Sequence, residues 1–374
     1  MKKFFQNETV FCIATFAAII SMFFVTPSVA YLTYIDFPVL ALLLSLMIVV
    51  AGFQSVGIFD KILPYLVKKA GNTRTLSALL IFVCFFTSMW ITNDVALITF
   101  VPFAILILKK IEKPELFIPV IVLQTIAANL GSMCTPIGNP QNLYLYTVSG
   151  MDMGSFLGIM MPATIISFVL LSISLLWIKK EKIGDLSLTD AIEIEDTHME
   201  GLKTVCYGIL FVLCLLTVLH IVDYRISLIC VLVAALILRP KLILKADYML
   251  LLTFVSFFIF VGNIKNIPFI YEFFSNQVAG KELLFGVLTS QVISNVPAAV
   301  LLSGFTDNVG DLLLGANLGG LGTIIASMAS LISFKFYVKE KHSSAKKYLM
   351  IFSVANVLFL MVLLLFTYIW GMLW

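Results

Sequence analysis

The sequence is poor in charge. Asp, Glu, Lys and Arg make up only 12% of its 374 residues, against about 25% in an ordinary soluble domain. Hydrophobic residues supply 61% of the chain, so lipid must be the solvent for most of it. This composition excludes an ordinary soluble protein or a nucleic-acid-binding protein, and it predicts a polytopic membrane protein.

Histidine and cysteine are also scarce. The three histidines fall in or near predicted loops and form no HExxH pair. The six cysteines lie in apolar segments without CxxC spacing, which indicates neither a disulfide framework nor a zinc site. The sequence contains no Ser/His dyad and no GxGD motif. We therefore predict that the protein is not an enzyme and uses no cofactor apart from a coupling ion.

Long apolar runs are abundant. A helix of about 20 residues spans a bilayer and satisfies its own backbone hydrogen bonds, so these runs predict an all-α polytopic membrane protein. Two lysines, an apolar stretch and the triplet Ser28-Val29-Ala30 resemble a cleavable signal peptide, but the apolar part is long for one and we expect a retained first helix. The runs lie near residues 8–26, 38–54, 75–108, 117–147, 155–178, 204–221, 226–238, 248–262, 283–303, 311–334 and 348–371.

The run at 75–108 is too long for one span and short for two. At about 1.5 Å per residue, one helix over this run would far exceed the ~30 Å apolar core of a bilayer. Arg74 precedes the run and lysines at 109–113 follow it, and such residues concentrate on the cytoplasmic side. A re-entrant helical hairpin with its apex at Thr92-Asn93-Asp94 satisfies both length and charge.

The run at 283–303 has the length of a single span, so charge must decide. If it crossed the membrane, the lysine-rich loop at 335–347 would lie outside. If it is a second hairpin with its apex at Ser294-Asn295, entering from the external face, that loop is cytoplasmic. With both runs as hairpins, only Arg225, Lys265 and Lys281 of the 24 Lys and Arg residues fall outside. The amino terminus is then cytoplasmic and the carboxyl terminus external.

The same sequence features occur in the same order in both halves, as in transporters with inverted-topology repeats. "SMWITN" and "SQVISN" each place a serine four residues before a hydroxyl and an asparagine, so serine and hydroxyl share a helix face. A polar, glycine-rich break interrupts the next helix in each half, "AANLGSMCTPIGNPQN" and "GANLGGLGT". We predict a first repeat at 1–178 with a hairpin at 75–108 and a discontinuous helix at 117–147, a cytoplasmic linker at 179–202, and a second repeat at 203–374 with a hairpin at 283–303 and a discontinuous helix at 311–334.

Broken helices have a functional implication. Irregular backbone is tolerated at membrane depth only where it lines a cavity or is buried in protein. The ends of the two helix segments at each break also direct their partial charges toward a central site. Pro136 and Pro297 indicate the first turns of the helices that follow the interruptions. The pattern predicts a small-ion site where two hairpins and two broken helices meet halfway through the bilayer.

Four segments resemble the ion transporter superfamily: "ITNDVALITFVPF", "NLGSMCTPIGNPQN", "SQVISNVPAAVLL" and "NLGGLGTIIASMASLIS". The closest resemblance is to its bacterial anion-permease branch with the citrate-transporter-like domain, related to the arsenite and sodium/proton antiporter branch and to the divalent anion–sodium symporters. It covers nearly the whole chain. It implies a homodimer in the bacterial cytoplasmic membrane that moves a di- or tricarboxylate or an inorganic oxyanion, coupled to Na⁺ or H⁺, by elevator-type alternating access.

The resemblance also implies two cation sites, each formed by a hairpin apex and the facing helix break. The first would use Ser88, Thr92, Asn93 and a carbonyl near Gly131. The second would use Ser290, Ser294, Asn295 and a carbonyl near Gly319. From the residues themselves we also predict substrate contacts, at Asn93, Thr135, Asn139, Asn142, Asn295 and Asn317. For the break residues Asn129, Asn139, Gln141, Asn142 and Asn317 the alternative, that they satisfy the interrupted backbone, stays open.

Asp94 departs from the divalent-anion pattern, which has a hydroxyl after the first asparagine, and agrees with the arsenite-pump branch. It is the only ionisable residue that we place near mid-membrane, and such residues are functional hypotheses. Asp94 is then a ligand of the coupling ion, a proton carrier or a helix cap. Two functions stay open: an anion transporter, and a Na⁺/H⁺ or arsenite-type antiporter in which Asp94 alternates between proton and cation.

Overall fold

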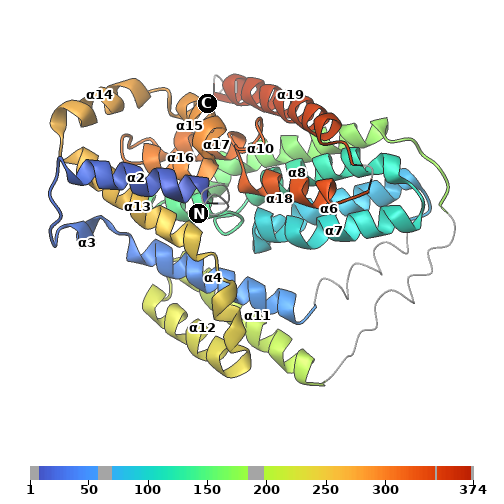
Figure 1. Cartoon of the computed structure of the whole chain (residues 1–374), viewed down its shortest axis with the longest axis horizontal. Helices are drawn as coiled ribbons and strands as arrows, with labels where there is room; N and C mark the ends of the chain where they lie inside the picture. The colour runs from blue at the N-terminus through green and yellow to red at the C-terminus, as the bar shows by residue number, and fades with distance from the viewer. Residues whose placement is uncertain (1–7, 58–69, 184–197, 342, 372–374) are drawn as a thin grey trace. The chain divides into compact units, whose positions relative to one another are not determined.

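The computed structural model describes residues 8–57, 70–183, 198–341 and 343–371. This part of the chain is helical (Figure 1), and its β structure is limited to one isolated bridge between Asn72 and Lys182. The helices are α2 (Thr9–Met22), α3 (Tyr31–Tyr34), α4 (Phe37–Ser55), α6 (Thr73–Ile91), α7 (Asn93–Lys110), η1 (Pro114–Leu116), α8 (Phe117–Ser132), α9 (Pro140–Ser149), α10 (Met153–Ser174), η2 (Leu175–Trp177), α11 (His198–Val218), α12 (Tyr224–Leu238), η3 (Pro240–Lys245), α13 (Tyr248–Lys265), α14 (Pro268–Val278), α15 (Glu282–Ile293), α16 (Asn295–Leu302), α17 (Val309–Leu318), α18 (Met328–Val338) and α19 (Ala345–Gly371).

Seven helices in the described ranges are long and apolar enough to cross a membrane. They are α4, α6, η1 with α8, α10 with η2, α11, α13 and α19. Large apolar side chains stay exposed on several of them, such as Ile165 on α10 and Met361 on α19, which are 55% and 62% exposed. Such surface suits a lipid solvent, and the protein is therefore a multi-pass helical membrane protein.

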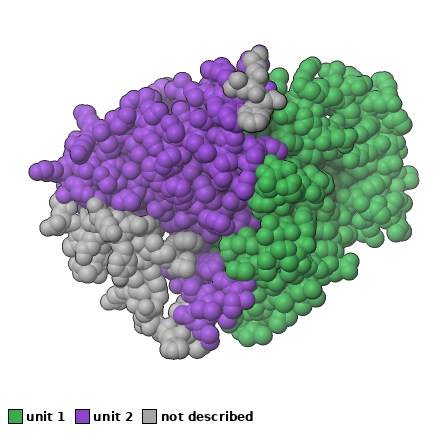
Figure 2. Space-filling view, turned by 180° about the vertical axis from the view of Figure 1, so that it is seen from behind, with its two compact units in different colours: residues 1–51, 140–156, 210–320 green, residues 52–139, 157–209, 321–374 purple. Residues whose placement is uncertain are grey.

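The chain divides into two compact units, which Figure 2 colours separately. Unit 1 holds residues 1–51, 140–156 and 210–320, and unit 2 holds residues 52–139, 157–209 and 321–374. Neither unit is continuous in sequence. The chain changes unit between residues 139 and 140 and again between 320 and 321, inside the two predicted helix breaks. The two segments of each predicted discontinuous helix therefore belong to different units.

Unit 2 is built around α8. Helices α6, α7, α18 and α19 all pack on it, and α18 also packs on α7. The side chain of Gln124 on α8 is fully buried, and its Nε2 donates to the carbonyl oxygens of Leu80 on α6 (3.1 Å) and Phe100 on α7 (3.4 Å). Hydrogen bonds of this kind join apolar helices where neighbouring lipid offers no competing partner. They fix α6 and α7 on the same central helix.

Unit 1 combines α2, α3, most of α4, α9 and α12 to α17. Helix α2 packs along α13, and α9 packs on α16 and α17. On α13, the buried Asn263 donates from Nδ2 to Ser21 Oγ and to the Tyr31 hydroxyl, each at 2.9 Å. The hydroxyl of Tyr144 on α9 lies 2.8 Å from Ser303 Oγ, just after α16. These contacts join segments that are far apart in the sequence.

The helix boundaries coincide with the predicted interruptions. The run at 75–108 forms α6 and α7 with Thr92 alone between them, and the run at 283–303 forms α15 and α16 with Ser294 alone between them. The prediction for Pro136 was wrong, because α9 begins at Pro140. Pro140 occupies the first helical position, where the missing N–H costs nothing. Of the predicted linker, residues 198–202 belong to α11, and 184–197 lie outside the described residues.

Candidate functional site

The two ends of the α6–α7 pair lie at the same end of unit 2. Glu181 contacts both: its backbone exchanges hydrogen bonds with Thr73 at the start of α6, and its Oε2 lies 2.5 Å from Lys113 Nζ, just after α7. Through this contact Glu181 raises the pKa of Lys113, and Lys113 lowers the pKa of Glu181. A chain that leaves and returns to one residue forms a hairpin, and Thr92 is its apex.

The α15–α16 pair in unit 1 is closed in a similar way. Glu282 begins α15, and its Oε1 accepts a 2.9 Å hydrogen bond from Thr306 Oγ1, which follows α16. The same oxygen accepts from the Gly280 backbone N–H at 3.1 Å. Glu282 is only 3% exposed, so these contacts are made away from solvent. Ser294 is the apex of this second hairpin.

Both apex residues share a rare backbone conformation. Thr92 has φ 70° and ψ 151°, and Ser294 has φ 76° and ψ 154°. Only glycine adopts this region at low cost, and another residue there stores about 1–3 kcal/mol of strain. Both residues carry a hydroxyl instead. A hydroxyl residue therefore holds a strained backbone position at the same place in both hairpins. This recurrence points to a role for the hydroxyl group.

Each apex is followed by an asparagine at the first position of the returning helix, whose side chain accepts from the next backbone N–H. Asn93 Oδ1 accepts from the Asp94 backbone N–H, and Asn295 Oδ1 accepts from the Val296 N–H, both at 3.0 Å. Both asparagines are 4% exposed. Their side chains therefore stabilise the free amides at the amino-terminal ends of α7 and α16 inside the protein.

Three helix ends meet at Asn129 in unit 2. Its Oδ1 accepts from Asn93 Nδ2 at the start of α7 and from Ser327 Oγ at the start of α18, both at 3.0 Å. Asn129 itself lies in the last turn of α8. The Asn93 backbone N–H also donates to the Gly138 carbonyl in the break, at 3.2 Å. Asn93, directly after the hairpin apex, is thus hydrogen-bonded both to the last turn of α8 and to the break that follows α8.

Gly131 lets α8 and α6 approach closely. A Cβ at this position would overlap the Phe85 carbonyl oxygen and would lie 2.7 Å from Ser88 Oγ. Ser88 is fully buried, and its Oγ donates to the Phe85 carbonyl at 2.9 Å. The predicted ligands Ser88 and Gly131 are therefore in contact.

The corresponding residues of unit 1 are also in contact. A Cβ at Gly319 would lie 2.6 Å from Ser290 Oγ, and one at Gly320 would lie 2.9 Å from Asn295 Nδ2. Gln291 Nε2 donates to the Gly319 carbonyl oxygen at 2.9 Å. The end of α17 thus lies against the apex of the α15–α16 hairpin, as the end of α8 lies against the apex of α6–α7.

The four residues predicted to contact only substrate fall into two pairs. In unit 2, Thr135 Oγ1 donates to the Met89 carbonyl, and Asn139 Nδ2 donates to Ser132 Oγ at 3.1 Å. In unit 1, Asn317 Nδ2 donates to Asn142 Oδ1 (2.6 Å) and to the Leu313 carbonyl (2.7 Å). Both hydrogens of the Asn317 amide are engaged, so in this structure it joins α17 to α9.

Asp94 lies in the first turn of α7 and is half-buried. Because it lies in the first turn of a helix, the free amides and the helix dipole favour a negative charge there. At the matching place in unit 1 stands Val296, which is 8% exposed. The carboxylate thus distinguishes one hairpin from the other.

Three residues outside the predicted site complete these contacts: Asn129, Ser327 and Gln291. Asn129 and Gln291 each stand inside a segment that the prediction used, two residues before Gly131 and directly after Ser290. Ser327 lies inside the quoted segment "NLGGLGTIIASMASLIS", four residues after "GANLGGLGT", but no repeat spacing singles it out. Its role depends on where α18 packs.

Each unit therefore brings together three helix ends. In unit 2 they are the amino-terminal ends of α7 and α18 and the carboxyl-terminal end of α8. In unit 1 they are the corresponding ends of α16, α9 and α17. Helix termini carry roughly half an elementary charge, positive at the amino end. Free amides suit anions and free carbonyls suit small cations, so each centre can hold an ion without a Lys or Arg side chain.

Helices that end at buried centres in a multi-pass protein are typical of membrane transport proteins. Residues 7–310 match the citrate transporter family, CitMHS, and the chain belongs to this family. The protein is accordingly a membrane transporter and not an enzyme.

Curated relatives agree with this assignment. The chain is 30% identical over 319 residues to uncharacterized transporter MJ0456 of Methanocaldococcus jannaschii, covering 85% of each chain. It is 29% identical over 304 residues to inner membrane protein YbiR of Escherichia coli, covering 80% of each. Silicon efflux transporter LSI3 of Oryza sativa subsp. japonica is 31% identical over 129 residues, which cover 34% of this chain and 26% of that protein.

Glycine at either apex should separate strain from function. We expect Thr92→Gly and Ser294→Gly to be more stable than Thr92→Ala and Ser294→Ala by about 1 kcal/mol, because glycine relieves the backbone strain. All four variants should lose transport, whereas Thr92→Ser should retain it. Thermal unfolding of the purified variants and uptake in cells measure the two effects. Glycine variants no more stable than the alanine variants would show that the apex is not strained.

Proposed function

We propose that the protein is a secondary active transporter of the cytoplasmic membrane that moves a small di- or tricarboxylate or inorganic oxyanion together with Na⁺ or H⁺. One observation carries the proposal. The same arrangement of residues occurs twice. Each copy has a hydroxyl residue with a strained backbone at a hairpin apex, followed by an asparagine that accepts from the next backbone N–H. Each copy also has a serine in contact with a glycine where a helix is interrupted. Twofold recurrence in one chain favours a pair of ion sites over two unrelated packing solutions.

The two hairpins are proposed to be re-entrant and to enter from opposite membrane faces as parts of inverted repeats. Closure of each pair at its base, through Glu181 and through Glu282, supports the hairpin shape. The charge pattern supports the orientation, because it leaves Lys281 outside and the lysines at 335–347 inside. The amino terminus is then cytoplasmic and the carboxyl terminus external.

We assign one cation site to each centre. The first uses Ser88, Thr92, Asn93 and a carbonyl near Gly131, with Asp94 beside it. The second uses Ser290, Ser294, Asn295 and the Gly319 carbonyl. Gln291 Nε2 donates to the Gly319 carbonyl oxygen, and a carbonyl oxygen has two lone pairs. Contact between each serine and its glycine supports both assignments.

The anion is proposed to bind at helix amino-terminal ends, with the coupling cation supplying countercharge. Thr135 and Asn139 lie in the first break, beside the start of α9. The family name, citrate transporter, supports a carboxylate, and the name of the rice relative supports the inorganic alternative. The name of the Escherichia coli relative supports the inner membrane. A homodimer with elevator-type alternating access remains part of the proposal, as the resemblance implies.

Asp94 favours a second candidate, a Na⁺/H⁺ or arsenite-type antiporter. It places a carboxylate at one hairpin apex, whereas the other apex has Val296 at the matching position. One titratable group can alternate between a proton and a cation, which exchange requires. Proton flux driven by a cation gradient in the absence of any anion would favour this candidate.

Ligand-dependent thermal stability tests the proposal. A ligand that binds the folded protein raises its apparent stability by mass action, by about 2.7 kcal/mol at 100 times its Kd. We expect one carboxylate or oxyanion to stabilise the purified protein only in the presence of its coupling ion, Na⁺ rather than K⁺, or low rather than high pH. Stabilisation by Na⁺ or by pH alone, with no anion effective, would replace the proposal with the antiporter.

A further inference from the structure

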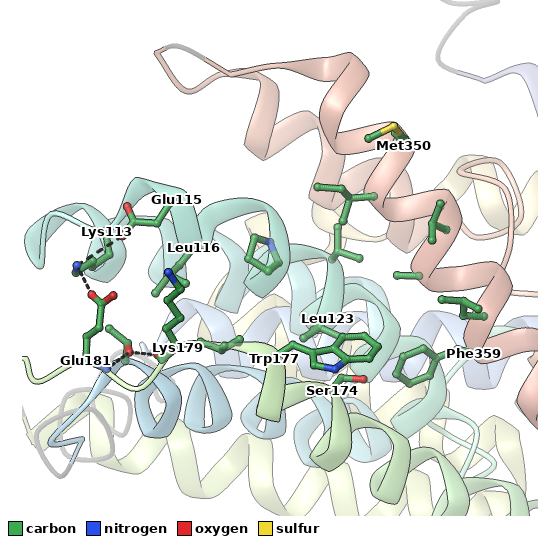
Figure 3. Close-up of a pocket in the computed structure, with 18 residues that line it drawn as sticks. Lys113, Glu115, Leu116, Leu123, Ser174, Trp177, Lys179, Glu181, Met350 and Phe359 are labelled. Atoms are coloured by element: carbon green, nitrogen blue, oxygen red, sulfur yellow. Dashed lines mark hydrogen bonds and ion pairs between the residues drawn. The ribbon is translucent and has the colours of Figure 1, made fainter.

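Unit 2 holds a groove of about 540 Å³ that neither centre uses (Figure 3). One wall is η1 with the first half of α8, another is the end of α10 with η2, and the third is α19. Its volume lies within the range of small-molecule sites, about 300–1,000 Å³.

The groove has one charged end and a long apolar part. Figure 3 shows Lys113, Glu115, Lys179 and Glu181 gathered at one end. Leu123, Trp177 and Phe359 line the groove away from this end. The side chains in this part carry two polar groups, the Ser174 hydroxyl, which donates to the Leu170 carbonyl at 2.9 Å, and the indole N–H of Trp177. The rest of the lining there is apolar and suits a hydrocarbon chain.

The apolar part opens toward lipid rather than toward water. Two walls belong to helices that are long and apolar enough to cross a membrane, α10 with η2 and α19. Their lining residues are exposed on the outer surface, with Trp177 80%, Met350 61% and Val354 56% exposed. In a membrane protein such surface meets acyl chains. An exposed tryptophan beside charged residues is typical of the membrane–water interface.

The charged end carries both signs. Lys113 Nζ lies 2.5 Å from Glu181 Oε2 and 3.6 Å from Glu115 Oε1, so its charge is already compensated. Lys179 lines the same end and forms no ion pair within 4 Å among the described residues, although its charge also acts on Glu181. A purely anionic headgroup would meet two glutamates as well as the lysines. A headgroup with a phosphate and a primary ammonium matches both signs, with the phosphate toward Lys179 and the ammonium toward Glu115.

We propose that this groove binds a zwitterionic phospholipid, phosphatidylethanolamine, with its headgroup at the Lys113–Glu181 end and an acyl chain along α8 and α19. The site contains none of the residues assigned to ion binding. It also joins α10, which precedes the linker, to α8, which carries Asn129 and Gly131. A bound lipid would therefore stabilise the helix on which the first ion centre is built.

Delipidated full-length protein, purified in detergent, tests this proposal. Phosphatidylethanolamine should raise its unfolding temperature and remain bound in native mass spectrometry, and phosphatidylglycerol should do so less. Ala355→Trp fills the groove, and its affinity for phosphatidylethanolamine should fall roughly ten-fold, the loss expected when about two methylene groups leave apolar surface. Val357→Trp is the matched control, because it adds the same side chain to α19 at a 48% exposed position that does not line the groove.

The headgroup has its own test. Replacing both Glu115 and Lys179 with glutamine should remove the preference for phosphatidylethanolamine over phosphatidylglycerol. Adding Ala355→Trp to this double variant should still lower its lipid affinity as much as it does in the wild type. Equal stabilisation of the wild type by both lipids would overturn the proposal. So would equal lipid binding by Ala355→Trp and Val357→Trp. A loss of dimer mass in Ala355→Trp without any lipid effect would assign the groove to a second copy of this chain instead.

Discussion

Asp94→Asn is expected to lower transport by about 10- to 100-fold and to flatten its pH dependence. Hydrogen bonds and ligation to a charged group are worth about 1.5–3 kcal/mol, and each 1.4 kcal/mol is a factor of ten. The variant should fold, because the bond from the Asp94 backbone N–H to Asn93 Oδ1 does not need the carboxylate. Uptake in proteoliposomes across a range of pH measures the effect.

Asp311→Asn is the matched control for Asp94. Asp311 also lies in the first turn of a helix, α17, but is exposed, and its backbone N–H is bonded to the capping Asn308 at 3.3 Å. We expect this variant to transport normally. If Asp94→Asn keeps both the rate and the pH profile of the wild type, Asp94 only stabilises the helix end and the antiporter candidate is also excluded.

Gly131→Ala is expected to abolish transport and to destabilise the protein by about 1–3 kcal/mol or more, the usual cost of overpacking. The new Cβ would overlap a backbone atom, the Phe85 carbonyl oxygen, which cannot rotate away. The hairpin would have to move off α8. Gly319→Ala should behave similarly, since its Cβ would lie 2.6 Å from Ser290 Oγ and 2.8 Å from the Gly315 carbonyl oxygen. Thermal unfolding and uptake of each variant measure the two effects.

Gly158→Ala on α10 controls for the change of residue type. Nothing lies within 4 Å of a Cβ at Gly158, so alanine there should raise stability by about 0.5–1 kcal/mol through its better helix propensity. Equal stability of Gly131→Ala and Gly158→Ala would mean that α6 and α8 are not in the close contact described here.

Much of the local structure is predictable from the sequence. Run length and charge predicted interruptions at Thr92-Asn93-Asp94 and at Ser294-Asn295, and the structure narrows them to the single residues Thr92 and Ser294. The i,i+4 spacing within "SMWITN" and "SQVISN" selected the serines that contact Gly131 and Gly319. These features are set by residues close together in the chain. Over such short distances, helical periodicity and the positions of glycines indicate which residues share a helix face and where a helix ends.

The remaining features depend on long-range packing. Proline chemistry placed the start of the helix after the first break at Pro136, whereas Pro140 satisfies the same rule and begins α9. The bond between Asn317 and Asn142 joins residues 175 apart in sequence, and that between Ser327 and Asn129 joins residues 198 apart. No spacing pattern connects such positions. The assignment of the two segments of each interrupted helix to different units therefore could not be predicted from the sequence and required the structure.

Cysteine labelling tests most directly whether the two hairpins enter from opposite membrane faces. In a background without the six native cysteines, single cysteines would replace Lys281, which directly precedes the second hairpin, and Lys339, which follows α18. A membrane-impermeant thiol reagent should label Lys281→Cys in intact cells and Lys339→Cys only after the membrane is opened. Labelling of both from outside would show that α15 and α16 cross the bilayer together, and the paired ion sites would have to be abandoned.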